Sequence, residues 1–257
     1  VSENADVIFA GAGLPLDLPG YLTEGSRTQL VPIVSSSRAA RLICEKWSAN
    51  YGYLPDAIVV EGPKAGGHLG FKKEQIEDEH YSLEHLIPEV VEVARSYAGQ
   101  KNIPVIAAGG IATGEDIARF MALGASAVQM GSIFVPTEEC DASVEFKKVY
   151  LNAHREDIRI IQSPVGMPGR AFDGEFIRNV AEGKEKPRSC PFHCIKTCDY
   201  TKSPYCIIKA LYNAAKGNMK KGYAFAGGNA YLSDKIRSVR EVVEKLKTDF
   251  FLSKAAF

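Results

Sequence analysis

The chain of 257 residues is long enough to bury a sizeable core, and its hydrophobic and charged fractions, 46% and 24%, are ordinary for a globular enzyme. Its 31 basic residues balance 31 acidic ones, so no global field would draw it to nucleic acid or to an anionic membrane. No apolar run approaches the ~20 residues that span a bilayer and no charged-then-apolar signal leads the chain, so we expect a cytoplasmic protein with small-molecule partners.

Five short apolar runs, most of them closed by a glycine or serine turn, predict five β-strands. Helix-length segments follow the second, third and fourth runs, and Pro88 predicts a kink or a late start in the second helix. Strands that alternate with helices indicate a parallel sheet with right-handed crossovers, the α/β class. The predicted strands are Val7–Ala10, Leu30–Val34, Asp56–Glu61, Ile103–Ala107 and Ser126–Met130, and the helices are Arg38–Ala49, Ser82–Ala98 and Thr113–Leu123.

The third strand leads into Val59–Phe71, VVEGPKAGGHLGF, a glycine-rich turn with one histidine. Glycines allow close approach of a ligand to the backbone, and histidine is the side chain that titrates near neutral pH. The turn lies at the C-terminal edge of a predicted strand, where α/β folds place their chemistry. A histidine that only packs a loop is the alternative. The adjoining glycines favour function and make His68 the first catalytic candidate.

Two consecutive β/α units end in similar turns, AAGG at Ala107–Gly110 and MGS at Met130–Ser132. Backbone N–H groups in such turns, with a helix N-terminus behind them, form a nest for a phosphate dianion. In a (β/α)₈ barrel the phosphate is typically held by the loops after the last two strands. Glycines that serve only tight turns are the alternative, and the tandem pair argues against it.

Beyond Phe134 the pattern changes and predicts a small, mainly helical lobe. We divide the chain into residues 1–135, the part with alternating strands and helices; 136–225, the small lobe; and 226–257, a return turn and a terminal helix. The predicted segments are the helix Thr137–His154, the irregular loop Pro164–Arg170, the helix Pro204–Tyr223, the turn Gly227–Asn229 and the helix Ser238–Leu246.

Four of the six cysteines lie in one segment, as Cys190-x₃-Cys194-x₃-Cys198-x₇-Cys206. Such clustering in a chain of this size argues against a secreted disulfide scaffold. Four thiolates would suffice for zinc or an iron–sulfur cluster, but the spacing matches neither the usual C-x₂-C zinc pattern nor the ferredoxin runs. We therefore expect reduced structural thiols and no metal site.

Three segments resemble the flavin-dependent nitronate monooxygenase family, formerly called 2-nitropropane dioxygenases. They are VIFAGAGLP at Val7–Pro15, EGPKAGGHLG at Glu61–Gly70 and the run IPVIAAGGIATGEDIARFMALGASAVQMGSIF at Ile103–Phe134, with a weaker match in SPVGMPGRA at Ser163–Ala171. Together they cover about half of the chain strongly. Flavin-type enoyl-acyl-carrier-protein reductases share this scaffold and the histidine turn.

The resemblance implies an FMN-binding TIM (β/α)₈ barrel with a smaller lobe. It further implies that residues 1–135 belong to the barrel, that the lobe lies over the active site and that the terminal helix packs on the barrel. It assigns His68 to catalysis, Gly66 and Gly67 to the neighbourhood of the flavin, and the FMN phosphate to Ala108, Gly109, Gly110, Gly131 and Ser132. The family begins with three further strands that have no counterpart here, so we count five strands where a barrel needs eight. Either the chain is part of a longer protein or other polypeptide supplies those strands.

The resemblance also implies a reaction, the oxidative denitrification of alkyl nitronates to carbonyl compounds and nitrite with O₂. Neutral His68 would remove the α-proton when a neutral nitroalkane is offered. The alternatives are an NAD(P)H-dependent enoyl-thioester reductase, in which His68 assists protonation or binding, and a flavin-binding sensor without catalysis. We expect a small-molecule substrate, a nitronate or an enoyl thioester. A homo-oligomer is compatible with this expectation.

Overall fold

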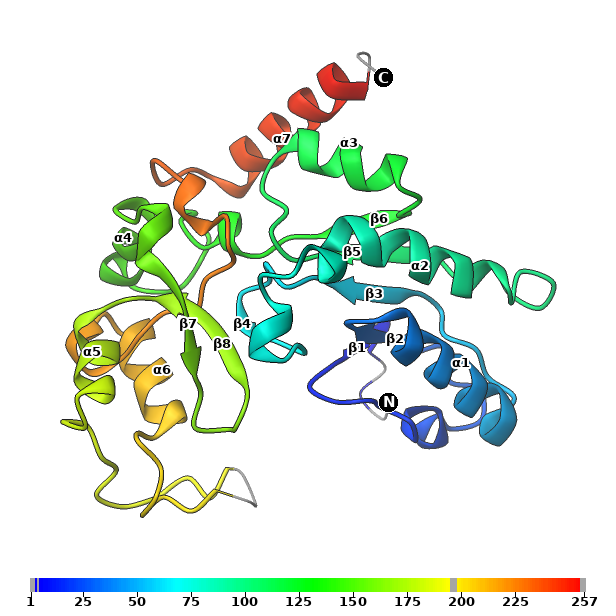
Figure 1. Ribbon diagram of the computed structural model, residues 1–257. Helices are drawn as coiled ribbons and strands as arrows, with labels where there is room; N and C mark the ends of the chain where they lie inside the picture. Colours follow the sequence, from blue (N-terminus) through cyan, green and yellow to red (C-terminus); the bar gives the residue numbers. More distant parts are fainter. Residues whose placement is uncertain (1–2, 4, 195–197, 255–257) are drawn as a thin grey trace. The chain divides into compact units, whose positions relative to one another are not determined.

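The computed structural model describes residues 3, 5–194 and 198–254, and it divides into two compact units (Figure 1). The first is drawn from the described parts of Val1–Pro63, Gly70–Gln129 and Asp249–Phe257, and the second from Lys64–Leu69 and Met130–Thr248. The division of the chain at residues 135 and 225 stays a prediction. No helix within the described ranges is long and apolar enough to cross a membrane.

The first unit is built on a five-stranded sheet in which every neighbouring pair is parallel, with the order β1-β2-β3-β5-β6 (Figure 1). The strands are β1 (Val7–Ala10), β2 (Gln29–Val34), β3 (Ile58–Glu61), β5 (Val105–Ala108) and β6 (Ala127–Gln129). The helices are α1 (Ser37–Tyr51), α2 (Leu83–Arg95) and α3 (Gly114–Ala122), with 3₁₀ turns at Leu18–Tyr21, Lys73–Gln75 and Glu79–Tyr81. The predicted alternation of parallel strands and helices is confirmed.

The helices of this unit begin where their caps lie. Ser36 Oγ accepts a hydrogen bond from the backbone N–H of Ala39 at the start of α1. Thr113 and Asp116 form a reciprocal capping box at the start of α3. Helix α2 begins at Leu83 and runs through Pro88, so the proline does not delay its start.

The core of the first unit lies on both faces of the sheet. Ile58, Val59 and Val60 of β3 are fully buried, as expected for a central parallel strand. Helix α1 buries Trp47, whose indole N–H donates to Pro15 O at 2.9 Å. The apolar runs of the sequence therefore become the strands that carry the C-terminal turns, including the turn after β5.

A half-buried ionic network ties the residues before β3 to β2. The Asp56 carboxylate accepts hydrogen bonds from Lys101 Nζ at 2.6 Å, Tyr53 Oη at 2.5 Å and Leu30 N at 2.7 Å. Burial of Asp56 raises the pKa of its carboxyl, but the hydrogen bonds from Lys101, Tyr53 and Leu30 outweigh it and hold that pKa below its usual 3.8. The ionised form therefore stabilises the fold.

We expect Asp56→Asn to lower the free energy of unfolding at neutral pH by about 1–3 kcal/mol, because it removes a charged acceptor from three donors. Since the folded-state pKa is depressed, this stabilisation is complete above about pH 3.8 and is lost as the pH falls through the folded value. Thermal unfolding from pH 7 to pH 3 would measure it. The difference in the free energy of unfolding between the wild type and Asp56→Asn should decrease as the pH is lowered. The exposed Asp141→Asn should have the same free energy of unfolding as the wild type. A difference that is constant with pH would contradict the account.

The second unit contains a three-stranded antiparallel sheet with the order β4-β8-β7 (Figure 1). Its strands are β4 (Gly67–His68), β7 (Ile158–Gln162) and β8 (Pro168–Phe172), and its helices are α4 (Val144–Leu151), α5 (Glu175–Ala181) and α6 (Ile207–Ala215). Helix α7 is Val239–Lys254, and 3₁₀ turns lie at Ser132–Phe134, Arg155–Asp157, Met219–Lys221 and Ala230–Leu232. The lobe is therefore helical, as predicted, but it also carries a hairpin.

The hairpin corrects the prediction of an irregular loop over Pro164–Arg170. Pro168 and Gly169 obscured the strand pattern, because both residues are rare in strand interiors. Gly169 is needed where β8 pairs on both sides, since a Cβ there would lie 3.1 Å from the Phe225 ring and 3.3 Å from Gly67 O. The strand is specified by close packing and not by alternation of side chains.

Two predicted helices are shorter in the structure and one is longer. The helix predicted at Thr137–His154 begins only at Val144, because Ser143 Oγ caps it by accepting from Phe146 N. The one predicted at Pro204–Tyr223 covers Ile207–Ala215, where Gly217, in a left-handed conformation, follows its end. Helix α7 continues to Lys254, beyond the predicted Leu246.

Candidate active site

The backbone of His68 is fixed by the short strand β4. Gly67 pairs with Arg170 and His68 with Gly169 of β8, and the Leu69 N–H donates to Pro168 O at 2.9 Å. The glycine-rich turn of the sequence is therefore hydrogen-bonded to the strand that contains the weaker motif, SPVGMPGRA. Two segments about 100 residues apart in the chain meet at this histidine.

The His68 ring has a polar partner on one atom and an aromatic partner at its side. Its Nε2 lies 2.7 Å from Ser163 Oγ, and its ring meets the edge of Phe225 with centroids 5.1 Å apart. Ser163 is almost fully buried, with a relative exposure of 3%. Its backbone closes the β7–β8 turn, because its N–H donates to Met167 O and its carbonyl accepts from Gly166 N. The buried hydroxyl therefore orients the imidazole, as donor or as acceptor according to which ring nitrogen carries the proton.

The half-buried site keeps the His68 ring neutral. Desolvation by burial lowers the pKa of His68 below its usual 6.5. A neutral imidazole at pH 7 has a lone pair on one ring nitrogen and can accept a proton. The ring is therefore able to accept a proton at neutral pH.

The glycines before His68 cross another backbone segment at close range. A Cβ on Gly66 would lie 2.7 Å from Gly227 N and 2.8 Å from the Ala226 carbonyl carbon, so only glycine fits. The Gly228 N–H donates to Lys64 O at 2.9 Å across the same crossing. The segment 226–228 therefore holds the histidine turn in place.

The same segment connects the histidine turn to the MGS turn. The Gly227 N–H donates to Ser132 Oγ at 2.9 Å, which leaves the hydroxyl hydrogen of Ser132 able to donate elsewhere. Of the predicted site residues, the second unit thus contains Gly66, Gly67, His68, Gly131 and Ser132.

Gly131 is open and exposed. No atom lies within 4 Å of the position that a Cβ would take there, and the residue precedes the 3₁₀ turn at Ser132–Phe134. A negatively charged oxygen could approach the backbone of this turn closely because no side chain covers it. The residues present in the MGS turn therefore fit the phosphate of a nucleotide cofactor.

The first unit contains the other predicted phosphate residues, at the end of β5. Ala108 is buried and its carbonyl accepts from Gly62 N at 2.9 Å. Gly109 and Gly110 have φ angles of 98° and 78°, a conformation that L side chains rarely adopt. This pair of glycines is thus required by the backbone conformation of the turn.

Sequence reasoning missed several residues of the site. Ser163, Phe225 and Gly227 are far from His68 in the chain, and no local pattern marks them as its partners. Glu61, the last residue of β3 in the first unit, is a further titratable group that sequence reasoning did not single out, and burial raises the pKa of its carboxyl to about 6. A carboxylate at the end of an apolar strand was the available signal for Glu61.

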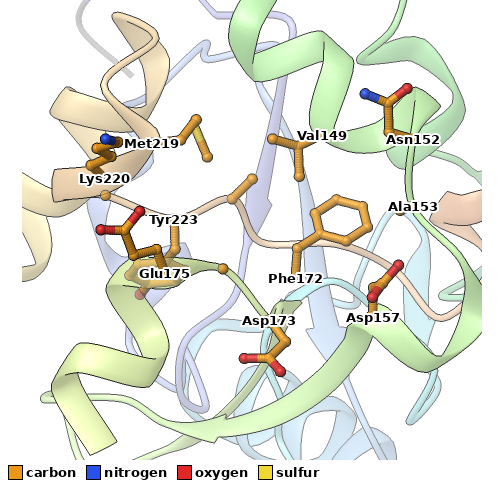
Figure 2. Close-up of a pocket in the computed structure, with 13 residues that line it drawn as sticks. Val149, Asn152, Ala153, Asp157, Phe172, Asp173, Glu175, Met219, Lys220 and Tyr223 are labelled. Carbon is orange, nitrogen blue, oxygen red and sulfur yellow. The ribbon is translucent and has the colours of Figure 1, made fainter. Parts of the chain in front are cut away.

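A separate cavity of about 300 Å³ lies in the second unit between α4, the end of β8 and the 3₁₀ turn at Met219–Lys221. Figure 2 shows the carboxyl groups of Asp157, Asp173 and Glu175 along one side of it, with Val149 and Met219 on the other. Arg159 and Arg178 pair with Asp173, so part of this negative charge is already balanced within the protein. The cavity includes none of the predicted site residues.

The family model for nitronate monooxygenase matches residues 1–249 of this chain. The chain belongs to the nitronate monooxygenase family. A probable nitronate monooxygenase of Staphylococcus saprophyticus is 33% identical over 140 residues, 54% of this chain and 38% of that protein. One of Staphylococcus aureus strain Newman is 34% identical over 128 residues, 49% of this chain and 34% of that protein. The chain therefore matches little more than a third of the length of these curated relatives.

Solved structures extend the similarity to the whole chain. FabK from Thermotoga maritima matches this chain with a TM-score of 0.74 and 28% sequence identity. The match covers 100% of this chain and 71% of the FabK chain. The nitroalkane oxidase of Streptomyces ansochromogenes has a TM-score of 0.72 at 23% identity, over 99% of this chain and 67% of its own, and shows the fold alone. The predicted α/β fold of the TIM-barrel type, and the predicted family, an oxidoreductase family, are confirmed.

Proposed function

We propose that this member of the nitronate monooxygenase family is an FMN-dependent enzyme that converts alkyl nitronates to carbonyl compounds and nitrite with O₂. The single observation that carries the proposal is the neutral, oriented His68 ring, in a chain whose family model bears that activity's name. A base poised below its usual pKa suits removal of an α-proton from a nitroalkane at neutral pH.

His68 and its surroundings supply the proton handling. The lone pair of the neutral ring accepts the α-proton of the nitroalkane, and the positive charge that develops lies beside Ser163 Oγ and the edge of Phe225. Ser163 holds the ring in one orientation, so the ring does not have to change its rotamer before it accepts the proton. Burial of the site limits the access of water to the ring.

Residues of the two turns would hold the cofactor. In this proposal the phosphate is bound by Gly109 and Gly110 after β5 and by Gly131 and Ser132 after β6, while Gly66 and Gly67 leave room for the flavin beside His68. Support comes from the open position at Gly131 and from the left-handed glycine pair. When bound, FMN would supply the redox chemistry between the nitronate and O₂.

The role of Ser163 gives a prediction at the hydrogen bond itself. We expect Ser163→Ala to lower kcat/KM on neutral nitroalkanes by about 10- to 100-fold, because the imidazole loses its orientation. Ser163→Thr keeps the hydroxyl and should restore most of the activity. In the wild type, kcat/KM should fall on the acid side only below pH 6.5, where His68 becomes protonated. A fall that is already half complete above pH 6.5, or a Ser163→Thr variant that recovers no activity, would contradict the assignment.

A second candidate function rests on the similarity to FabK, which covers the whole chain at 28% identity. The resemblance of the histidine turn to flavin-type enoyl-acyl-carrier-protein reductases makes an NAD(P)H-dependent enoyl-thioester reductase the alternative. Here the same neutral ring would assist protonation of the reduced substrate or its binding.

One assay panel separates the two candidates. Oxygen uptake with an alkyl nitronate is measured beside NADH- and NADPH-dependent reduction of a crotonyl thioester, on the same flavin-loaded preparation. We expect nitronate-dependent oxygen uptake. Thioester reduction without oxygen uptake would replace the proposed function with the reductase.

A further inference from the structure

Four cysteines of the second unit line one cavity. Cys190, Cys194 and Cys198 come from the loop after α5, and Cys206 is the N-cap residue of α6. All four are free thiols, and the other two cysteines, Cys44 and Cys140, do not line this cavity. Four thiols from separate positions in the loop therefore converge on one small volume.

Among the residues that the structure describes, the walls of the cavity contain no other strong ligand. The thiols are accompanied there by two serines and by no carboxylate, imidazole or ammonium group of a described residue, and the other lining residues are Pro164, Val165, Pro187, Ile207 and two tyrosines. Carboxylate-free, sulfur-rich surroundings select soft metals and exclude the hard cations Mg²⁺ and Ca²⁺. The chemistry of the lining is thus that of a thiolate-ligated centre.

The arrangement of the thiols favours a cluster over a single ion. Around one zinc ion with Zn–S bonds of about 2.3 Å, all four sulfurs would lie within roughly 4 Å of each other. No three Cys, His, Asp or Glu side chains in the part of the chain that the structure describes gather closely enough to hold one metal ion. In a [4Fe–4S] cluster each cysteine binds a different iron, so its ligands surround a volume instead of a point.

The spacing supplies enough ligands but does not by itself select the cluster. Plant-type ferredoxins hold a [2Fe–2S] cluster with C-x₄-C-x₂-C and a fourth, more distant cysteine. The loop here, C-x₃-C-x₃-C followed by Cys206, differs from that run in the position of its middle cysteine. The convergence of the four thiols on one cavity, and not their spacing, therefore carries the assignment.

One side of the cavity packs on a buried core. Tyr205 and Ile207 line it and also belong to a buried core with Phe176 and Tyr223, in which the Tyr205 and Tyr223 hydroxyls lie 3.2 Å apart. Val165, also at the cavity, packs against this core. The loop would thus present its thiols over a preformed apolar base, which shields a cluster from water.

We propose that Cys190, Cys194, Cys198 and Cys206 ligate an iron–sulfur cluster of the [4Fe–4S] type. The expectation of structural thiols rested on spacing alone, and the shared cavity is what the spacing could not reveal. The site is independent of the flavin turns and stands whether or not the proposed reaction is correct.

The test is the iron and acid-labile sulfide content of the protein after anaerobic purification and reconstitution, with zinc measured in the same samples. We expect about four iron and four sulfide per chain, and a low-temperature electron paramagnetic resonance signal after reduction with dithionite. Cys194→Ser and Cys198→Ser should lose both, and because these two thiols are exposed the variants should fold, which circular dichroism checks. Cys140→Ser, outside the cavity, is the matched control and should keep the cluster.

Three results would overturn the proposal. They are a wild-type protein that takes up only traces of iron and sulfide, a preparation that holds one zinc ion per chain in their place, and folded Cys194→Ser and Cys198→Ser variants that retain the wild-type iron and sulfide.

Discussion

His68→Ala should lower kcat/KM on a neutral nitroalkane by roughly 10² to 10⁴, the usual contribution of a positioned proton acceptor. The fall on the pre-formed nitronate should be far smaller, because that anion has already lost its α-proton. The neutral state of the ring and its 2.7 Å contact with Ser163 are the structural basis for this difference. Steady-state kinetics with both forms of one substrate measure it.

The controls for this variant separate chemistry from loop support. The His68 side chain is half-buried and its backbone is held by β8, so flavin content and thermal stability should stay near wild type. Equal losses on nitroalkane and nitronate would refute the general-base role even if activity vanished. A selective loss on crotonyl-thioester reduction would favour the reductase.

Gly131→Leu should abolish flavin retention while leaving the fold intact. A Cβ at this position meets no atom within 4 Å, so a larger side chain has space in the protein itself and obstructs only what binds against the turn. We expect the melting temperature of the apoprotein to change by no more than about 2 °C, as for other exposed positions. Flavin absorbance per chain after purification, and after incubation with excess FMN, is the measurement.

Gly99→Leu is the matched control for Gly131→Leu. Gly99 is also exposed and open on the Cβ side, but it follows α2 and lies outside both predicted phosphate turns. It should retain flavin as wild type does. Full FMN occupancy in Gly131→Leu would contradict the assignment of the MGS turn to the phosphate, and a melting temperature much below that of Gly99→Leu would show that the position has a structural role.

Local features of the sequence predicted the first unit well. Buried parallel strands are continuous apolar runs, and the caps at Ser36 and Thr113 satisfy helix N–H groups within three residues, so both signals are short-range. The glycine turns at Gly109 and Gly131 were visible for the same reason. Each of these features depends on neighbours in the chain and not on the tertiary fold.

The second unit was predicted less well because its signals are long-range. Strand β8 contains Pro168 and Gly169, and it forms only because β4 and β7 pair with it on both sides. The glycine at position 66 was visible, but the reason for it, a crossing with the backbone of Gly227, was not. Ser163 likewise became a partner of His68 only when the chain folded. Sequence patterns identified the histidine, and tertiary contacts supply its environment.

The central claim is that a nitronate is the electron donor to a flavin held by this protein. It is tested most directly by mixing the flavin-loaded protein anaerobically with an alkyl nitronate, or separately with NADH or NADPH, and following the flavin absorbance. We predict that the nitronate bleaches the flavin, that O₂ restores the absorbance, and that nitrite appears. Bleaching by NADH or NADPH but not by the nitronate would contradict the claim in favour of the reductase, and bleaching by none of them would favour a flavin-binding sensor.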